Sequence, residues 1–294
     1  MLIIPIQKIT TLMKWYTNYL SAYEIPFAQA PGQAISRVKE RIKRIRTDHP
    51  LVSVIAIAHN EESRILSCLW SLCDNQCDFP MEILVVNNNS TDHTEEVLKE
   101  LGVTYFNEPQ KGPGHARQCG LNHARGKYHI CIDSDTLYPP RYIVTMVKAL
   151  QKKGVVCAYA LWSFLPNEQY SSIGLFFYET MRDLYLKLQN RKRPELNVRG
   201  MVFAFHTEKA RKEGFRTDII RGEDGSLALA LKKYGKLKFV TTRKARAITG
   251  YGTVSADGSL FNSFKKRAIK GIKHFTSLFY SKNKYEDEDS NLIK

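Results

Sequence analysis

The sequence predicts an α/β protein whose core is a mostly parallel sheet flanked by helices. Short apolar runs rich in Val and Ile alternate with segments in which apolar residues recur at helical spacing. This alternation is typical of βαβ units, in which successive strands lie parallel. The chain has 294 residues, of which 43% are hydrophobic and 25% are charged. This is ordinary globular composition, which excludes wholesale disorder and leaves room for one large domain or two small ones.

Seven segments are expected to be strands because they are short, rich in β-branched or aromatic residues and bounded by turn residues. The run LVSVIAIA at residues 51–58 is continuously apolar, as expected for a strand that is buried on both faces. In chain order, the expected strands are residues 51–58, 82–86, 103–106, 128–132, 155–160, 200–205 and 237–240.

Helices are expected where apolar residues repeat every three or four positions between these strands. Ser90, Thr91 and Asp92 offer an N-cap to one of them. The expected helices are residues 61–75, 90–101, 114–125, 142–153, 173–188, 208–213 and 222–234. Two further helical patterns, at residues 6–20 and 37–46, belong to a basic N-terminal extension over residues 1–47, and a basic amphipathic tail occupies residues 251–294.

Positive charge is concentrated towards the two ends of the chain. The formal net charge is +15, of which residues 1–47 supply +6 and residues 260–284 supply +7. A polyanionic partner, either a membrane surface or a nucleic acid, is therefore expected to touch these flanks. No apolar run approaches the roughly 18 residues of a bilayer span, and residues 1–7 lack the pattern of a secretory signal. A cytoplasmic protein is expected, and its six cysteines, which match no zinc-binding spacing, are expected to be free thiols.

Three polar clusters directly follow expected strands. They are His59-Asn60-Glu61, Asn87-Asn88-Asn89 and Asp133-Ser134-Asp135. Because the carboxyl ends of parallel strands meet at one edge of a sheet, these clusters are expected to lie together. Asp133 and Asp135 can chelate Mn²⁺ or Mg²⁺ through oxygen, and such a cation can bridge a substrate diphosphate. The alternative is a turn that uses Asp and Ser for its own backbone hydrogen bonds.

Two further segments carry candidate catalytic or anion-binding residues. Glu223 and Asp224 lie at the expected start of a helix, where a carboxylate is either a cap favoured by the helix dipole or a general base for a reacting hydroxyl. Lys111 and Arg117 lie in a Gly-rich turn that enters a helix, and cations beside backbone N–H groups suit phosphate. The turn is not a P-loop, and an ordinary loop with a solvated arginine is the alternative.

Five motifs resemble, in order, those of the family-2 glycosyltransferases of the GT-A fold, over roughly residues 50–245. They are His59-Asn60-Glu61, NNNSTD at residues 87–92, ARQCGL at residues 116–121, Asp133-Ser134-Asp135, and GEDGSL at residues 222–227. The resemblance implies a GT-A domain over residues 48–250, with a nucleotide-sugar half at 48–160 and an acceptor half at 161–250. It implies an enzyme that transfers a sugar, with inversion, from a nucleoside-diphosphate sugar to a hydroxyl acceptor.

The resemblance also implies roles for individual residues. Asp224 is expected to be the catalytic base, with Glu223 beside it, and Asp135 and Asp133 are expected to hold Mn²⁺ or Mg²⁺. Nucleotide-sugar contacts are implied for Ala58, His59, Asn60, Glu61, Asn87, Asn89, Lys111, Arg117, Asp133 and Ser134. The acceptor side is expected at Trp162, Arg199 and Gly200 within an aromatic-rich half of the chain, because sugars and lipids both stack on aromatic faces.

Two departures from the family's pattern refine these expectations. The family usually has an Asp at the end of the second strand that accepts a hydrogen bond from the nucleobase, and this chain has Asn87, whose amide accepts and also donates. A UDP-sugar is favoured as donor, and a GDP-sugar stays open. The QxxRW motif of processive synthases is absent, so the transfer of one sugar per encounter is expected rather than polymerisation.

Residues 260–280 have the composition of a helix that lies on an anionic membrane. Aromatic and apolar residues recur at helical spacing, and basic residues fill the remaining faces. The residues expected to touch the membrane are Phe261, Phe264, Lys265, Lys266, Arg267, Lys270, Ile272, Lys273 and Phe275. This interpretation implies a peripheral position on the inner face of the cell membrane and a lipid-linked glycan or glycolipid as acceptor. The alternative is a C-terminal helix that packs on the domain and keeps a solvated basic face.

Two other classes of protein fit the sequence less well than the transferase. A nucleotidyltransferase would typically carry a Gly-rich, basic loop after its first strand, where this chain has His59-Asn60-Glu61. A non-catalytic basic adaptor for membranes or nucleic acid would need neither Asp135 nor Asp224. The sequence shows no RRM, KH or helix-turn-helix signature, so no nucleic-acid partner is expected.

Overall fold

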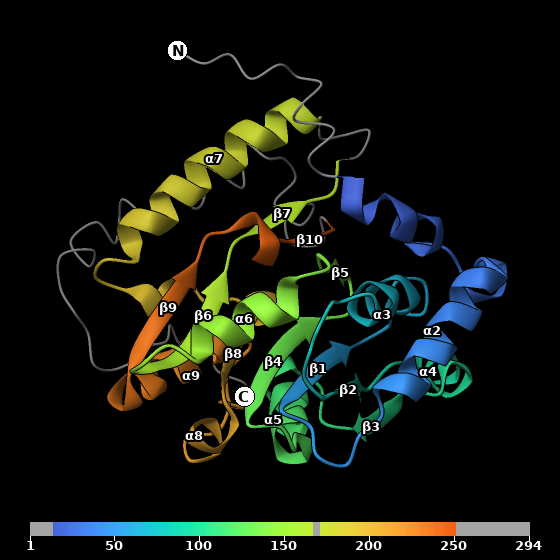
Figure 1. Cartoon of the computed structure of the whole chain (residues 1–294), viewed down its shortest axis with the longest axis horizontal. Helices are drawn as coiled ribbons and strands as arrows, with labels where there is room; N and C mark the ends of the chain where they lie inside the picture. Colours follow the sequence, from blue (N-terminus) through green and yellow to red (C-terminus); the bar gives the residue numbers. More distant parts are fainter. Residues whose placement is uncertain (1–13, 167–170, 251–294) are drawn as a thin grey trace.

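A computed structural model describes residues 14–166 and 171–250, which form two sheets with helices packed around them (Figure 1). The seven-stranded sheet has the order β3-β2-β1-β4-β8-β6-β9, and the three-stranded sheet has the order β5-β10-β7. The strands are β1 (Val52–Ala58), β2 (Met81–Asn88), β3 (Thr104–Glu108), β4 (Tyr128–Asp133), β5 (Thr136–Leu137), β6 (Val155–Ala160), β7 (Trp162–Phe164), β8 (Phe203–His206), β9 (Lys236–Val240) and β10 (Ala247–Thr249). The α-helices are α2 (Gly32–Ile45), α3 (Ile65–Cys73), α4 (Thr94–Leu101), α5 (Pro113–His123), α6 (Tyr142–Leu150), α7 (Ser172–Gln189), α8 (Thr207–Arg211) and α9 (Glu223–Leu231).

The predicted α/β architecture with a mostly parallel sheet is confirmed. β1 pairs in parallel with both β2 and β4, and β2 pairs in parallel with β3. The chain order therefore reverses between β1 and β4, which creates the kind of switch point where ligands bind in open α/β sheets. β8 is the exception, because it runs antiparallel to both of its neighbours, β4 and β6.

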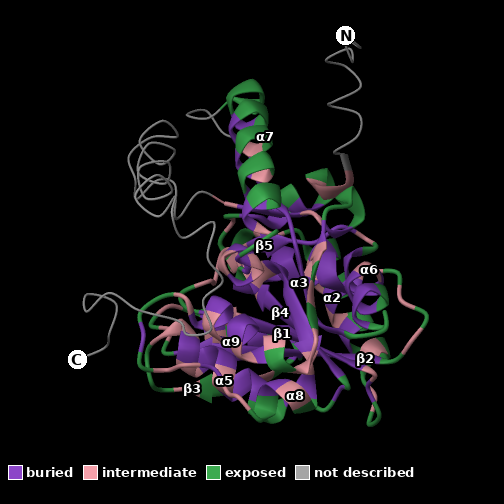
Figure 2. Ribbon diagram, turned by 90° about the vertical axis from the view of Figure 1, so that its left-hand side faces the viewer, coloured by how far each residue is buried: buried purple, intermediate pink, exposed green. Residues whose placement is uncertain are grey.

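The inner strands of the large sheet are buried because helices cover both of its faces (Figure 2), whereas the edge strands β3 and β9 are partly exposed. Val52, Val54 and Ala56 of β1 pack with α2, α3, α4 and α6 on one face. Ile55 of the same strand points to the other face, where it packs with α5. This alternation explains why the sequence of β1 is apolar apart from Ser53, whose buried hydroxyl donates to Glu82 Oε1.

The described part of the N-terminal extension, from Lys14 onwards, is packed against the domain. Tyr19 of its first described element, the 3-10 helix η1 (Lys14–Ala22), and Tyr23 just after this helix form a cluster with Leu137 of β5 and Ile248 of β10. Val38 and Ile42 of α2 join the main core beside α3 and α4. The predicted helix over residues 6–20 is described only from Lys14 onwards, where it is a 3-10 helix, and residues 1–13 lie outside the described part.

Several predicted elements differ from the observed ones. The strand expected at residues 200–205 begins as a 3-10 helix, η4 (Gly200–Val202), and only then becomes β8. The helix expected at residues 61–75 begins only at Ile65, because residues 59–64 form the turn that leaves β1. α4 begins at Thr94 and its N-cap residue is His93, which makes no side-chain capping bond, so the cap expected at residues 90–92 is wrong by one position. Asp92 lies just before the cap and accepts a hydrogen bond from the Thr94 backbone N–H at 3.0 Å. All six cysteines are free, as expected.

Candidate active site at the carboxyl edge of the sheet

The three polar clusters predicted at strand ends lie at one edge of the sheet. In the pairing register Ala58 of β1 is opposite Asn87 of β2, and Ile57 is opposite Asp133 of β4. The turns that follow these strands therefore leave the sheet side by side. The prediction that these clusters lie together is confirmed.

The first two clusters hold each other in place. The Asn60 backbone N–H donates to Ser90 Oγ at 3.0 Å, and the Thr91 backbone N–H donates to Asn60 Oδ1 at 2.7 Å. His59 Nδ1 lies 2.7 Å from the Asn88 carbonyl oxygen. Asn60 and Asn89 both have positive φ angles, 57° and 55°, a conformation that asparagine tolerates better than most residues. These polar residues therefore shape the edge as well as line it.

The orientation of the Asn87 amide is fixed by a short relay. Asn87 Nδ2 donates to Asn107 Oδ1 at 2.8 Å, and Asn107 Nδ2 donates to Glu95 Oε1 at 3.2 Å. Because a carboxylate at the end of the relay only accepts, the amide oxygen of Asn87 is left as an acceptor. That oxygen is buried and has no hydrogen-bond partner among the described residues.

Asn88 positions the loop that carries Lys111, a role that its place in the sequence does not predict. Asn88 Nδ2 donates to the carbonyl oxygens of Glu108 and Gln110, and Asn88 Oδ1 accepts from the Gly112 backbone N–H at 2.9 Å. Lys111 itself is exposed at this loop, just before α5. The only signals of this role in the sequence were an asparagine at a strand end and a Gly-rich loop further along the chain.

Arg117 is the electrostatic centre of the site. Its guanidinium is 3% exposed, donates from Nη2 to Asp133 Oδ1, and donates from Nη1 to the Ile132 carbonyl oxygen at 2.9 Å. Its Nε lies 3.6 Å from Asp224 Oδ1. The two carboxylates raise the pKa of Arg117 above its ordinary value, so the guanidinium stays charged although it is buried. The structure thus joins the strand-end carboxylate, the α5 arginine and the α9 carboxylate in one cluster.

Asp224 is a buried carboxylate with a high proton affinity. Burial and the nearby Glu223 raise the pKa of Asp224 to about 8, and Arg117 opposes this rise. The residue sits at the start of α9 because Gly222, with a φ of 101°, turns the chain into the helix in a conformation that other residues rarely adopt. Once deprotonated, a carboxylate with such a pKa accepts a proton from a hydroxyl more readily than an ordinary aspartate does.

Gly200 leaves the space in which Arg117 and Asp224 meet. A Cβ atom at this position would lie 2.7 Å from Asp224 Oδ2 and 2.6 Å from Arg117 Cζ, inside van der Waals contact. Gly200 was expected on the acceptor side, and the structure places it against the ion pair. Any larger residue here must displace one of the two side chains.

Asp135 lies in a cluster with Glu61 and Arg64. Burial and the charge of Asp133 raise the pKa of Asp135, and its Oδ1 accepts from Thr136 Oγ1 at 2.9 Å. Burial raises the pKa of Glu61 to about 8, although Arg64 Nε lies 2.8 Å from Glu61 Oε2. Arg64 follows Glu61 by one helical turn, which is the only sign in the sequence that the two side chains pair.

The charges of Asp133, Asp135 and Glu61 fit a hard divalent cation. All three offer carboxylate oxygen, which Mn²⁺ and Mg²⁺ prefer, and the mutual repulsion that raises the pKa of Asp135 is relieved by a bound cation. Within residues 14–166 and 171–250 no three His, Cys, Asp or Glu side chains are already arranged as a complete metal site.

Tyr23 connects the N-terminal extension to the metal motif. Its hydroxyl donates to the Asp135 carbonyl oxygen at 2.9 Å, and the residue is 9% exposed. Tyr23 was not among the residues expected at the site, because nothing in its local pattern marks a contact with a residue 112 positions away.

The other residues expected at the site are divided between this edge and the interior. Ser134 is buried within the strand-end motif. Trp162, expected as an acceptor contact, is only 5% exposed in β7, and the Arg182 guanidinium lies 4.4 Å from its ring centroid. It therefore offers no open face for stacking.

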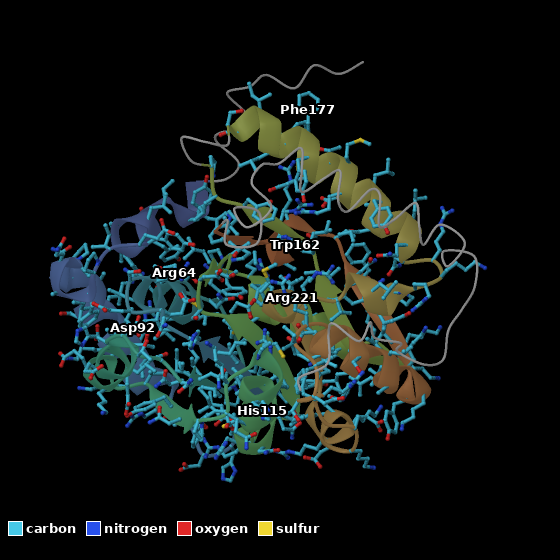
Figure 3. The ribbon with its side chains drawn as sticks, turned by 180° about the vertical axis from the view of Figure 1, so that it is seen from behind. Arg64, Asp92, His115, Trp162, Phe177 and Arg221 are labelled. Carbon is cyan, nitrogen blue, oxygen red and sulfur yellow. The ribbon has the colours of Figure 1, made fainter. Side chains whose placement is uncertain are left out.

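Arg199 is exposed, and its guanidinium lies 5.9 Å from the ring of Trp162, which Figure 3 labels. The residues expected to touch a membrane, Phe261 to Phe275, lie outside the described residues.

Comparison with known proteins identifies the family of this chain. The sequence model of "Glycosyl transferase family 2" matches residues 53–214, which is more than half of the chain. The chain is 29% identical over 140 residues to "Glycosyltransferase GlyA" of Streptococcus pneumoniae, covering 46% of this chain and 19% of that protein. It is 27% identical over 151 residues to "4,4'-diaponeurosporenoate glycosyltransferase" of Staphylococcus aureus, covering 48% of this chain and 40% of that protein. The chain thus spans less than half the length of these curated relatives.

Two solved structures share the fold. The mannosyltransferase PcManGT from Pyrobaculum calidifontis, in complex with GDP-Man and Mn²⁺, has a TM-score of 0.55 and 22% identity, covering 81% of this chain and 72% of that one. S. aureus TarS 1-349 in complex with UDP has a TM-score of 0.51 and 19% identity, covering 68% of this chain and 60% of that one. The described residues thus have the GT-A fold that the sequence motifs implied.

Proposed function

Because the chain belongs to glycosyltransferase family 2, we propose that it transfers one sugar from a nucleoside-diphosphate sugar to a hydroxyl acceptor, with inversion. The observation that carries this proposal is the buried cluster of Asp133, Arg117 and Asp224 at the carboxyl edge of the sheet. It places a strand-end carboxylate suited to a cation and a high-pKa carboxyl suited to a base on either side of one guanidinium.

Asp224 is the base in this proposal. Its carboxylate accepts the proton of the acceptor hydroxyl as the hydroxyl oxygen attacks the anomeric carbon and the nucleoside diphosphate leaves from the opposite face. Attack from the face opposite the leaving group inverts the configuration. Glu223, buried beside Asp224, raises the pKa of Asp224 and so increases its proton affinity.

Asp135 and Asp133 hold Mn²⁺ or Mg²⁺ in this proposal, with Glu61 close by. A cation at this position supplies charge neutralisation for the departing diphosphate. The complex of PcManGT with GDP-Man and Mn²⁺ supports the use of a divalent metal. Arg117 fixes Asp133 and Asp224 relative to each other. It is therefore proposed as a positioning residue rather than as the nucleotide contact that the motif resemblance implied.

The donor is proposed to be a UDP-sugar, with a GDP-sugar as the second candidate. The free acceptor oxygen of Asn87 suits an N–H group on the edge of the base, which uracil and guanine both offer. Related structures with UDP and with GDP-Man support both nucleotides. His59, Asn60, Asn89 and Lys111 belong to the same edge of the sheet and are proposed to complete the donor site.

The acceptor is proposed to be a lipid-linked glycan or a glycolipid at the cytoplasmic face of a membrane. The support is the basic, aromatic pattern of residues 260–280 in the sequence. The S. aureus relative, which is named for its action on 4,4'-diaponeurosporenoate, also supports an apolar acceptor.

Calorimetric binding of UDP, GDP and CMP, each with Mn²⁺ and with EDTA, tests the donor site. Metal-dependent binding of one diphosphate that Asp135→Ala abolishes is expected. Asp78→Ala, at an acidic residue in the loop between α3 and β2, is the matched control and should bind like the wild type. If none of the three nucleotides binds to the folded protein, the donor site does not exist. The anomeric configuration of the product, read by NMR, tests inversion, and a retained configuration excludes Asp224 as the base.

A further inference from the structure

The exposed large apolar side chains of the described residues are concentrated on one helix. Leu20 and Ile220 lie elsewhere, and the other seven all belong to α7. Their exposed fractions range from 39% to 64%. They are Ile173, Phe176, Phe177, Met181, Leu184, Tyr185 and Leu188. We call this set the α7 apolar face.

The α7 apolar face points away from the body of the protein. The opposite side of the helix carries the buried residues Leu175, Tyr178 and Leu186, which pack into the main core. An amphipathic helix was predicted here, and an apolar stripe normally faces the core. In this chain α7 has a second apolar face, which projects from the body at the top of the molecule (Figure 2). An exposed patch of this kind marks an interaction surface.

The charges around the α7 apolar face select an anionic partner. The two carboxylates of the helix, Glu179 and Asp183, turn inward, where both pair with Arg246. The exposed charged residues between positions 171 and 192 are all basic, and they are Lys187, Arg191 and Lys192. A helix with aromatic and aliphatic residues on its outer face and cations at one end has the character of an interfacial membrane helix. A dimer of this chain through α7 is less favourable, because the second α7 has no exposed carboxylate to pair with these cations.

α7 is connected to the metal motif through the three-stranded sheet. Thr136 of β5 follows Asp135, β10 pairs with both β5 and β7, and β7 is held to α7 by Glu179. Glu179 accepts from Ser163 Oγ at 2.7 Å and from the Phe164 backbone N–H at 2.8 Å. In Figure 3, Phe177 lies at the outer edge, and Trp162 lies between it and the sheet. A surface bound at α7 would therefore have a fixed orientation relative to Asp135.

We propose that the α7 apolar face lies on an anionic phospholipid surface and inserts its aromatic and aliphatic side chains at the boundary between headgroups and acyl chains. α7 is a different segment of the chain from residues 260–280, for which the sequence alone predicts a membrane contact. The proposal names the membrane contact for the lipid-linked acceptor, and in that respect it rests on the proposed function. Within residues 14–166 and 171–250 no helix has the length and apolar character of a membrane span.

Flotation of the full chain with vesicles of phosphatidylcholine containing about one third phosphatidylglycerol tests the proposal. The wild type is expected to float with the vesicles. The double variant Phe177→Ser/Leu184→Ser is expected to bind at least about tenfold more weakly, because two large side chains no longer enter the apolar layer. Ile220→Ser is the matched control, since Ile220 is 49% exposed but lies away from α7, and it should float like the wild type. Metal-dependent nucleotide binding should be unchanged in all three proteins.

The proposal is overturned if the double variant floats like the wild type, or if the wild type does not float. It is also overturned if light scattering shows that the wild type is a dimer and the double variant a monomer while flotation is unchanged. The α7 apolar face then binds a second copy of the chain. If the double variant Phe264→Ser/Phe275→Ser no longer floats and the α7 double variant still does, residues 260–280 are the membrane contact instead of α7. Nucleotide binding is measured separately, so a failed donor site and a failed membrane face give different results.

Discussion

The Nε of Arg117 lies 3.6 Å from Oδ1 of Asp224, and neither atom has a hydrogen-bond partner among the described residues. The two groups are thus close enough to attract but are not locked together. Because Arg117 also donates to Asp133, its guanidinium links the proposed base to the proposed metal motif. The charge balance of the site depends on this single buried cation.

Replacing Arg117 is expected to lower both the folding stability of the protein and its rate of sugar transfer. Arg117→Ala leaves Asp133 and Asp224 without their common partner, and breaking a buried ion pair in this way costs about 3–5 kcal/mol. Arg117→Lys keeps the charge but cannot reach Ile132, Asp133 and Asp224 at once, so a smaller loss of stability and a large fall in kcat are expected. Chemical denaturation and steady-state kinetics measure the two effects. A variant that raises only the KM for the donor, with normal stability, would show instead that Arg117 is a nucleotide contact.

The parallel half of the fold could be predicted from sequence because its signals are local. β1, β2 and β4 are short β-branched runs, and the strand-end rule then places His59, Asn87 and Asp133 at one edge without any knowledge of tertiary contacts. β5, β7 and β10 were not predicted as a sheet, because strands of two or three residues are too short to show a period.

The contacts that organise the site depend on tertiary structure. Arg117 was expected to contact phosphate or the nucleotide, and its burial arises because Asp133 and Asp224 come together from distant parts of the chain. Trp162 looked like an exposed aromatic platform, but β7 is enclosed by α7 and its ring is covered by Arg182. The helical stripe of α7 was recognised, but spacing alone cannot tell which face of a helix meets solvent.

Adding one methyl group at Gly200 is expected to reduce activity strongly. In Gly200→Ala the new Cβ would collide with both Arg117 and Asp224, so one of them must move away from the other. A misplaced base typically costs about a hundredfold in rate. Gly32→Ala is the matched control, because a Cβ at Gly32, in the first turn of α2, meets nothing within 4 Å. The kcat of both variants checks this, and normal activity in Gly200→Ala would contradict the close approach.

The rate is expected to rise with pH up to about 8. Asp224 acts as a base only when deprotonated, and its pKa is raised to about 8 by burial and by Glu223. kcat/KM should therefore increase about tenfold per pH unit below this value and level off above it. A profile that is flat from about pH 6 upwards would mean that Asp224 titrates normally and that burial does not tune it.

Asp224→Asn is expected to be inactive at every pH but more resistant to alkaline conditions than the wild type. The folded wild type holds the Asp224 proton more tightly than the unfolded chain, so its stability falls as pH rises from about 4 to about 8. The asparagine variant has no such proton to lose, so its folding stability lacks this decrease with pH. Urea denaturation of both proteins at about pH 6 and 9 measures the difference.

Removing the Tyr23 hydroxyl is expected to weaken metal-dependent nucleotide binding. In Tyr23→Phe the Asp135 carbonyl oxygen loses its 2.9 Å hydrogen bond, so the backbone of the metal motif is held less firmly. A neutral hydrogen bond contributes about 1 kcal/mol, which corresponds to a several-fold loss of affinity. Tyr16→Phe, in the 3-10 helix η1 that ends just before Tyr23, is the control and should bind normally. If calorimetry gives Tyr23→Phe and the wild type the same nucleotide affinity, the Tyr23 hydroxyl does not support the metal motif.

Replacing His129 is expected to make the protein less sensitive to acid. His129 is 1% exposed, stacks on Phe205, and has no hydrogen-bond partner on either ring nitrogen among the described residues. Burial, together with Arg117 and Arg211, lowers the pKa of His129 to about 3. The unfolded chain takes up this proton below about pH 6.5 and the folded protein does not, so folding stability is lost as pH falls from about 6.5 towards 3.

The size of this loss can be measured with His129→Leu, which has no proton to take up. One pKa unit corresponds to about 1.4 kcal/mol, so between about pH 7.5 and 5 the wild type should lose about 2 kcal/mol more than the variant. His49→Ala, at an exposed histidine, should lose as much as the wild type. Urea denaturation at the two pH values gives each difference directly. If His129→Leu and the wild type lose the same stability, the imidazole is protonated in the folded protein and must have a partner that this arrangement of Phe205 and Arg117 does not provide.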